Sequence, residues 1–362
     1  MSSIVFRYAC ADPDEDTSHR PNGCSAVLLR IANGELPIAR FCLTMPLSIH
    51  HSRTRVLAGF AVIYLVWGST YLAIAYAVRS LPPVLTTAAR FTLAGALLCA
   101  WGWARGAPRP SWVQWRAATI AGALLVGGGT ATVCWAEQSV PSGLASLLAA
   151  TVPLWFVLLD WAGPERRRPH GLIAAGIAVG LIGIGLLTAP TGSAAPGTQA
   201  FGAGALLVLI AAILWAVGSL YSRHAPLPTS GTLGMGMQML AGGVLCFPAG
   251  LVLGERAVID VARVPTIAWV AVAYLTVAGC LIAFTTYLWL LRVSTPARVA
   301  THAYVNPVVA VALGWAVAGE PFGVRTLVAA GLIIAAVVLI TTGQQRTGIA
   351  DPAHLALPTE PS

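Results

Sequence analysis

Long apolar runs separated by short polar connections dominate the sequence between Val56 and Thr342. A bilayer core of about 30 Å needs roughly 20 apolar residues for one helical crossing. The runs are continuously apolar and do not alternate every second residue, which argues against barrel strands and for helices. The predicted membrane helices cover residues 56–78, 84–103, 117–137, 142–161, 170–189, 200–221, 232–254, 267–290, 296–318 and 322–342. The predicted fold class is therefore an all-α integral membrane protein with ten transmembrane helices.

An internal repeat divides these helices into two sets of five. When Trp67 is aligned with Trp215, the pattern of apolar and small residues continues in register through the next helix. Further along, Pro153 aligns with Pro307. Because each set holds an odd number of helices, the second set must enter the membrane in the opposite sense, as in many alternating-access transporters. The sequence therefore predicts two inverted five-helix repeats.

Polar tails flank the two repeats, which are expected at residues 56–190 and 200–342. Residues 1–55 contain an acidic cluster and no apolar run of membrane length, so they are either disordered or, in large part, upstream of the true start at Met45. Residues 343–362 are polar and contain proline, which predicts a disordered cytoplasmic tail.

Composition supports the membrane class. Hydrophobic residues make up 57% of the chain and charged residues 9%, whereas soluble domains carry about 25% charged residues. The arginines that give the net charge of +8 are scattered between apolar runs, which argues against nucleic-acid binding. The seven cysteines have no metal-ligand spacing. We therefore expect no metal site and no cofactor.

Arginine placement predicts the orientation. Arginines are concentrated in the connections on the side of the N-terminus, for example at Arg53, Arg105 and 166–168, and are sparse in the opposite connections, which contain Arg79 and Arg325. Cytoplasmic loops carry the excess of positive charge in membrane proteins. Both termini are therefore expected in the cytoplasm, with the protein in the inner membrane.

Short motifs occur in a characteristic order along the chain. They are Val66-Trp67-Gly68-Ser69-Thr70-Tyr71, Arg90-Phe91, Val140-Pro141-Ser142-Gly143-Leu144-Ala145-Ser146, Asn306-Pro307 and Gly319-Glu320-Pro321. Together with the repeat, they resemble the ten-helix EamA family of the drug/metabolite transporter superfamily over residues 56–342. The tail at residues 1–55 has no place in that pattern. The resemblance implies efflux of small organic molecules across the inner membrane, without naming the substrate.

The predicted function is a secondary transporter that exports amino-acid-like or amphipathic metabolites. The sequence contains no phosphate-binding loop, so a gradient would drive accumulation. Import or facilitated flux by the same fold is the alternative, and an intramembrane enzyme is a remote one, since hydrolase motifs such as G-x-S-x-G and H-E-x-x-H are absent from the sequence. Expected partners are a small-molecule substrate and the lipid bilayer, with the chain as a monomer or weak homodimer.

Charged residues within the apolar runs are candidates for substrate binding, because charge within a membrane is energetically costly. Arg90 lies about 10 Å into the second run at 1.5 Å per residue. It either faces a central cavity, paired with a carboxylate from the substrate or from Glu137, or stabilises helix packing. Its repeat mate Gln238 is uncharged, so the cavity would be asymmetric. Glu137 is either a proton-coupling carboxylate or a solvated residue at a helix end.

The ninth run is the most polar. Arg298, His302 and Asn306 are spaced by four, so they share one face of a continuous helix. A polar face in a membrane is expected to line a cavity, and His302 is a candidate for proton coupling because histidine titrates near neutral pH. Pro153 and Pro307 are candidate hinges, since a proline in mid-helix removes a backbone donor.

Aromatic residues complete the candidate site. Trp67, Tyr71, Trp215 and Tyr287 combine apolar rings with polar groups, which suits amphipathic solutes. For any single one of them, helix packing is the alternative interpretation.

Overall fold

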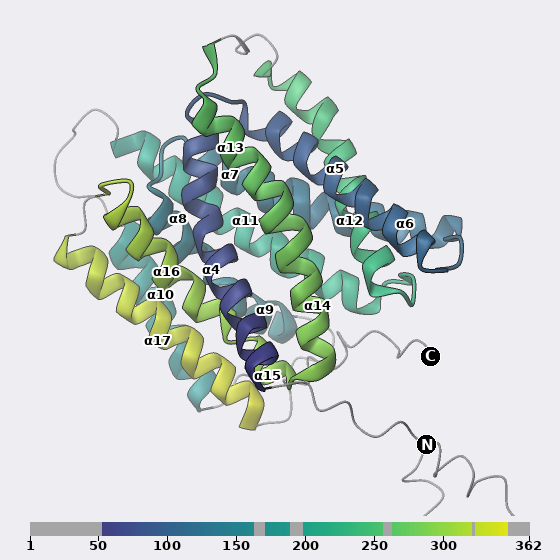
Figure 1. The fold of residues 1–362 in the computed structure, drawn as a ribbon. Coiled ribbons are helices and arrows are strands. Elements are labelled where there is room, and N and C mark those ends of the chain that lie inside the picture. The colour runs from purple at the N-terminus through teal and green to yellow at the C-terminus, as the bar shows by residue number, and fades with distance from the viewer. Residues whose placement is uncertain (1–52, 163–170, 189–197, 256–262, 321–322, 347–362) are drawn as a thin grey trace, which may run out of the picture. The chain divides into compact units, whose positions relative to one another are not determined.

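The computed structural model describes residues 53–162, 171–188, 198–255, 263–320 and 323–346, and within these ranges it contains helices and no strand. The helices are α4 (Arg53–Val78), α5 (Pro83–Ala104), α6 (Trp112–Gly122), α7 (Thr132–Ala136), α8 (Ser142–Ala149), α9 (Val152–Ala162), α10 (Leu172–Thr188), α11 (Thr198–His224), α12 (Gly231–Val252), α13 (Thr266–Tyr274), α14 (Ala283–Val293), α15 (Pro296–Val299), α16 (His302–Ala316) and α17 (Val324–Arg346) (Figure 1). The all-α class is confirmed. Most of the tail at residues 1–55 and most of that at 343–362 lie outside the described residues, and α17 continues past residue 343 to Arg346.

Two of the predicted segments contain wide π-helical turns. The stretch η1 (Ala123–Ala131) joins α6 to α7, and η4 (Leu275–Ile282) joins α13 to α14, each without a break. These are the third and eighth predicted segments, which are equivalent in the repeat. Long π-helical stretches are rare, and shorter π turns often mark functional sites.

Eight helical stretches in the described ranges are long and apolar enough to cross a membrane. The fifth predicted segment is the shorter apolar helix α10, with 17 residues. The fourth and ninth segments are not continuous: α8 ends at Ala149 before α9 begins at Val152, and α15 ends at Val299 before α16 begins at His302. The number of ten membrane crossings therefore stays a prediction.

The crossing of α5 and α12 shows that the repeats are inverted. These helices are equivalent in the repeat, yet Gly102 lies against Leu233, whereas Gly95 lies against Leu240. Residue numbers rise along α12 as they fall along α5, so the two helices run antiparallel. The backbones are so close that a Cβ on Gly95 would lie 2.3 Å from the Leu240 nitrogen. Small residues allow such close approach in membranes.

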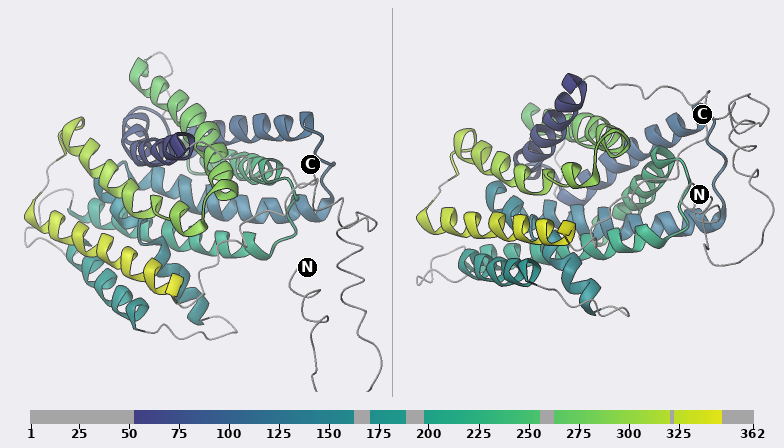
Figure 2. Two further views of the ribbon diagram at one scale, coloured as in Figure 1. Left: turned by 60° about the horizontal axis from the view of Figure 1, so that its bottom comes forward. Right: turned by 90° about the horizontal axis from the view of Figure 1, so that it is seen from below.

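A second pair of equivalent helices, α10 and α17, packs in the same antiparallel way (Figures 1 and 2). Gly176 lies against Ile340 and Gly183 against Ile333. Gly185 of α10 lies away from these contacts, since no atom lies within 4 Å of a Cβ built there. Gly185 therefore does not contribute to the contact.

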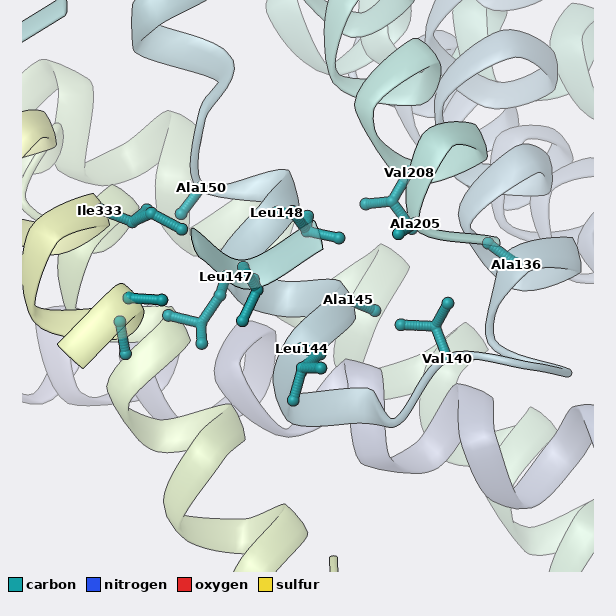
Figure 3. Packing of buried hydrophobic residues seen from close by; sticks show 13 residues of the cluster. Ala136, Val140, Leu144, Ala145, Leu147, Leu148, Ala150, Ala205, Val208 and Ile333 are labelled. Carbon is teal, nitrogen blue, oxygen red and sulfur yellow. The ribbon is translucent and has the colours of Figure 1, made fainter. Parts of the chain in front are cut away.

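The first helix of each half packs among helices of the other half. Helix α4 contacts α13, η4, α14 and α16, and Figure 1 shows it between α14 and α16. Its repeat mate α11 contacts α6, η1, α7, α8 and α9. Buried leucines of α8 also pack against Val208 of α11 and Ile333 of α17 (Figure 3). Side chains of α4 consequently meet residues more than 200 positions away in sequence.

Candidate functional site

Four rings gather where α4 meets α14 and the start of α16. The ring centroid of Trp67 lies 5.1 Å from Phe284, 5.3 Å from Tyr287 and 5.1 Å from His302, and Tyr287 lies 5.7 Å from His302. We call these four residues the aromatic cluster. Three of them were candidates from the sequence, and the structure brings those three together. Phe284 was missed, although its spacing of three from Tyr287 places both on one helix face.

Hydrogen bonds orient two members of the aromatic cluster. The Trp67 indole N–H donates to the Gly279 carbonyl in η4 over 3.3 Å. His302 begins α16, and its Nδ1 donates to the carbonyl of Val299, the last residue of α15, over 2.8 Å. Nδ1 is the donor because a carbonyl can only accept a hydrogen bond. The backbone at the interruption between the two helices therefore positions the imidazole.

Trp215, the repeat mate of Trp67, lies on α11, which packs among helices of the first half. A Cβ on Gly129 of η1 would lie 2.6 Å from a carbon of the Trp215 ring. Each of the two tryptophans therefore lies against the π-helical stretch of the opposite half. Trp215 makes no ring contact with the aromatic cluster among the described residues.

Arg90 is buried in α5, with 4% of its surface exposed. Its Nη2 donates to the Cys134 sulfur over 3.6 Å, and its guanidinium lies 4.8 Å from the centroid of the Phe91 ring. Its Nε has no hydrogen-bond partner in the described part of the chain. The guanidinium is thus held by a thiol and a ring, neither of which neutralises its charge.

Glu137 caps the end of α7, one turn after Cys134, and is 7% exposed. Both of its carboxylate oxygens lack a hydrogen-bond partner among the residues that the structure describes. The direct pair with Arg90 considered from the sequence is therefore not formed. Tyr71 packs against the hydrophobic cluster that contains Ala136, the residue before Glu137.

Gln238 does not share the surroundings of its repeat mate Arg90. Its side-chain amide donates to the Gly234 carbonyl over 3.2 Å, and its Oε1 accepts from the Ser222 hydroxyl over 3.3 Å. Because α5 and α12 cross near Gly95, Arg90 and Gln238 lie on opposite sides of the crossing. The structure does not bring the two residues to one point.

The polar face expected along the ninth segment is not continuous. Arg298 is exposed in the short helix α15, and the break after Val299 separates it from His302. Asn306 is buried against Gly68, and its Oδ1 has no partner in the described ranges. Arg298, His302 and Asn306 therefore do not form the single face that an unbroken helix would present.

The candidate hinges have different surroundings. Pro307 is buried inside α16. Pro153 is the second residue of α9, so the mid-helix position expected for it is wrong. A proline is tolerated in the first turn of a helix, where no backbone donor is lost. The interruption before α9 therefore lies just ahead of Pro153.

Two carboxylates of the second half accept hydrogen bonds from the starts of helices in the first half. Glu320 accepts from Ser142 N and Oγ, both over 2.7 Å, and from Gly143 N over 3.0 Å, at the start of α8. Glu255 accepts from Val84 N over 3.0 Å and Leu85 N over 2.8 Å, at the start of α5. Carboxylates are favoured at helix N-termini because free amide donors point toward them. We call Glu255 and Glu320 the cross-repeat caps.

The sequence predicted only part of this arrangement. Glu320 belongs to the Gly319-Glu320-Pro321 motif ahead of α17, and the structure shows it bound to the start of α8. Its repeat-related residue Glu165 lies outside the described residues. Glu255 was missed, although the start of α5 at Pro82-Pro83 has no capping side chain of its own and so needs an acceptor from elsewhere.

Comparisons with known proteins agree with the architecture. The model of the EamA-like transporter family matches twice, over residues 55–189 and 202–342. The inner membrane transporter YedA of Escherichia coli (strain K12) is 38% identical over 284 residues, covering 78% of this chain and 89% of YedA. The aromatic amino acid exporter YddG of Ancylobacter novellus is 32% identical over 242 residues, covering 64% of this chain and 77% of YddG. A crystal structure at 27% identity covers 82% of this chain and 99% of its own, with a TM-score of 0.55.

Proposed function

The chain belongs to the EamA-like transporter family, and from this premise we propose that it exports small amphipathic organic metabolites across the inner membrane by alternating access. The aromatic cluster carries this proposal. Half-buried rings from α4, α14 and α16 offer apolar walls, and the indole, phenol and imidazole add polar groups. The name of the relative YddG, an aromatic amino acid exporter, supports a substrate of this kind.

Alternating access is supported by the fold. The antiparallel crossings of α5 with α12 and of α10 with α17 relate the halves as inverted repeats, which allows the two faces of such a carrier to exchange roles. Import by the same fold is the alternative, since direction depends on the driving gradient. The family is one of transporters, which favours either direction over an intramembrane enzyme.

Proton coupling is the proposed driving mechanism, with His302 and Glu137 as candidate groups. The His302 imidazole lies within the aromatic cluster, where Tyr287 is the titratable side chain in ring contact with it. Aromatic faces stabilise a nearby cation, so the cluster can accommodate a protonated imidazole. The variant His302→Gln should lose accumulation driven by a pH gradient while retaining downhill exchange of substrate. Accumulation that survives in both His302→Gln and Glu137→Gln would contradict proton coupling through these groups.

The experiment that tests the function is transport by purified protein in proteoliposomes with an imposed pH gradient. A panel of aromatic amino acids, aliphatic amino acids and sugars separates amphipathic substrates from others. We expect aromatic amino acids to move and sugars not to move. No flux of any amphipathic solute, in either direction, would contradict the proposal.

Orientation is tested with reporter fusions. We propose that both termini are cytoplasmic, because arginines are concentrated on that side. Green fluorescent protein fused after Arg346 should fluoresce, and alkaline phosphatase at the same position should be inactive. Active phosphatase there would reverse the orientation.

A further inference from the structure

Two opposite charges of the first half are buried near each other without neutralising each other. The Arg90 guanidinium contacts the Cys134 sulfur, and Glu137 follows Cys134 by three residues. Three residues correspond to a rise of about 4.5 Å along a helix. Arg90 Nε and both Glu137 oxygens are without partners in the described chain.

Burial of both groups without partners requires an explanation. An isolated charge away from water is strongly unfavourable, and arginine cannot escape this by releasing its proton. By contrast, the buried carboxylate of Glu255 takes two backbone N–H donors, and the buried amide of Gln238 bonds Gly234 and Ser222. Arg90 and Glu137 are the exceptions among the charged groups that the structure shows to be buried.

We propose that Arg90 and Glu137 bind the zwitterionic head of an α-amino acid, with Arg90 taking the carboxylate and Glu137 taking the ammonium group. The inference rests on the proposed function and names the part of the substrate that this site recognises. Charge-assisted hydrogen bonds of both signs would then satisfy both groups at once. A zwitterion also leaves the net charge of the site unchanged, which an anion or a cation alone would not.

The surroundings give the bound molecule a direction. Tyr71 packs against the hydrophobic cluster that contains Ala136, the residue before Glu137. Tyr71 also follows Trp67 by four residues on α4, so both share one helix face. Trp67 is the centre of the aromatic cluster, in contact with Phe284, Tyr287 and His302. A head at Arg90 and Glu137 therefore suits an amino acid whose large apolar side chain extends along α4 toward this cluster.

Truncated ligands test each charge separately. The probes are L-phenylalanine, phenethylamine, which lacks the carboxylate, and 3-phenylpropionate, which lacks the ammonium group. Affinities are measured by calorimetry on purified full-length protein, because the amine crosses bilayers without a carrier. We expect the wild type to bind phenylalanine at least tenfold more tightly than either truncated probe.

The variants should remove one preference each. Arg90→Gln should bind phenylalanine and phenethylamine equally while still preferring phenylalanine to phenylpropionate. Glu137→Gln should show the reverse. The charge-conserving variants Arg90→Lys and Glu137→Asp should retain both preferences in part, and the exposed Arg105→Gln serves as the matched control that keeps both.

Several outcomes would overturn the assignment. They include equal wild-type affinity for the three probes, equal loss of all three in Arg90→Gln and Glu137→Gln, and preferences that persist in both variants. Binding of the amine alone at Glu137 would reduce the site to a cation or proton site and also overturn it. Transport of other amphipathic solutes without binding of phenylalanine would overturn this inference and leave the proposed function intact.

Discussion

Equivalent positions in the two halves of this protein carry the same glycines and different polar groups. Gly95 and Gly243 are repeat mates, and each makes the same close backbone contact with the opposite helix. Gly106 and Gly254 are also repeat mates, and both have positive φ, at 84° and 76°. The polar residues do not match: Arg90 is replaced by Gln238, and Glu255 by Ala107. The glycines on which the fold depends are thus present in both halves, whereas each of these charged residues is present in one half alone.

The cross-repeat caps show the same difference. Glu255 serves the start of α5, which begins at Pro83 without a capping side chain. The equivalent helix α12 is capped locally by Ser230, whose hydroxyl accepts from Leu233 N. At α8, Ser142 offers Glu320 two donors, whereas the corresponding Pro296 has no backbone N–H. Both caps therefore join the halves at the starts of helices of the first half.

The comparison is tested most severely at the helix crossing. The variants Gly95→Ala and Gly243→Ala should both prevent accumulation of folded protein, since each added methyl meets backbone atoms at 2.5 Å or less. The expected loss exceeds the ~1–3 kcal/mol of an overpacked core, because backbone and not a flexible side chain must move. Fluorescence-detected size-exclusion chromatography measures the yield.

The control for this prediction is Gly331→Ala, where no atom lies within 4 Å of the added methyl. It should be neutral or slightly stabilising, since alanine favours helices over glycine. A severe effect in only one of Gly95→Ala and Gly243→Ala would contradict the symmetry of the crossing.

The next largest effect is expected at the cross-repeat caps. Replacing either Glu320 or Glu255 with alanine leaves backbone donors unsatisfied and should lower the free energy of unfolding by about 2–3 kcal/mol. Titration with sodium dodecyl sulfate in mixed micelles, followed by circular dichroism, measures the change. Glu320→Gln retains an acceptor oxygen and should lose less than Glu320→Ala. Wild-type stability of Glu320→Ala would show that this cap does not stabilise the interface between the halves.

A smaller effect is expected at the uncharged mate of Arg90. Gln238→Ala removes the bond with Ser222 and should lower the free energy of unfolding by about 1 kcal/mol. Ser222→Ala should produce a similar loss, and the double variant should lose little more than either single one. Fully additive losses in the same titration would show that the two side chains act independently.

The smallest effect is expected from giving the second half the missing carboxylate. Ala107→Glu places an acid at the repeat mate of Glu255, but Ser230 already caps α12. Stability should therefore change by no more than about 0.5 kcal/mol. A gain as large as the loss in Glu255→Ala would instead show that the two halves can exchange this cap.

Local chemistry explains what the sequence predicted well. Apolar runs of membrane length predicted helices, since a backbone in lipid must satisfy its own hydrogen bonds. The repeated small residues of α5 and α12 predicted two related halves. Trp67, Tyr287 and His302 were selected as polar aromatic groups within apolar runs, a property of each residue and its near neighbours.

Hydropathy and residue type were thus enough to predict the helical membrane class, the repeat and the types of side chain that carry chemistry. The packing of the helices sets the side-chain partners, which the sequence did not predict: Trp67 with Phe284, Glu320 with Ser142, and Gln238 with Ser222 instead of a site shared with Arg90. It also places the Arg90 guanidinium on Cys134, one turn before Glu137, without a bond between the two charges among the described residues. The reason is that hydropathy acts over one turn or one helix, whereas side-chain partners depend on which helices cross, at what height and in which direction.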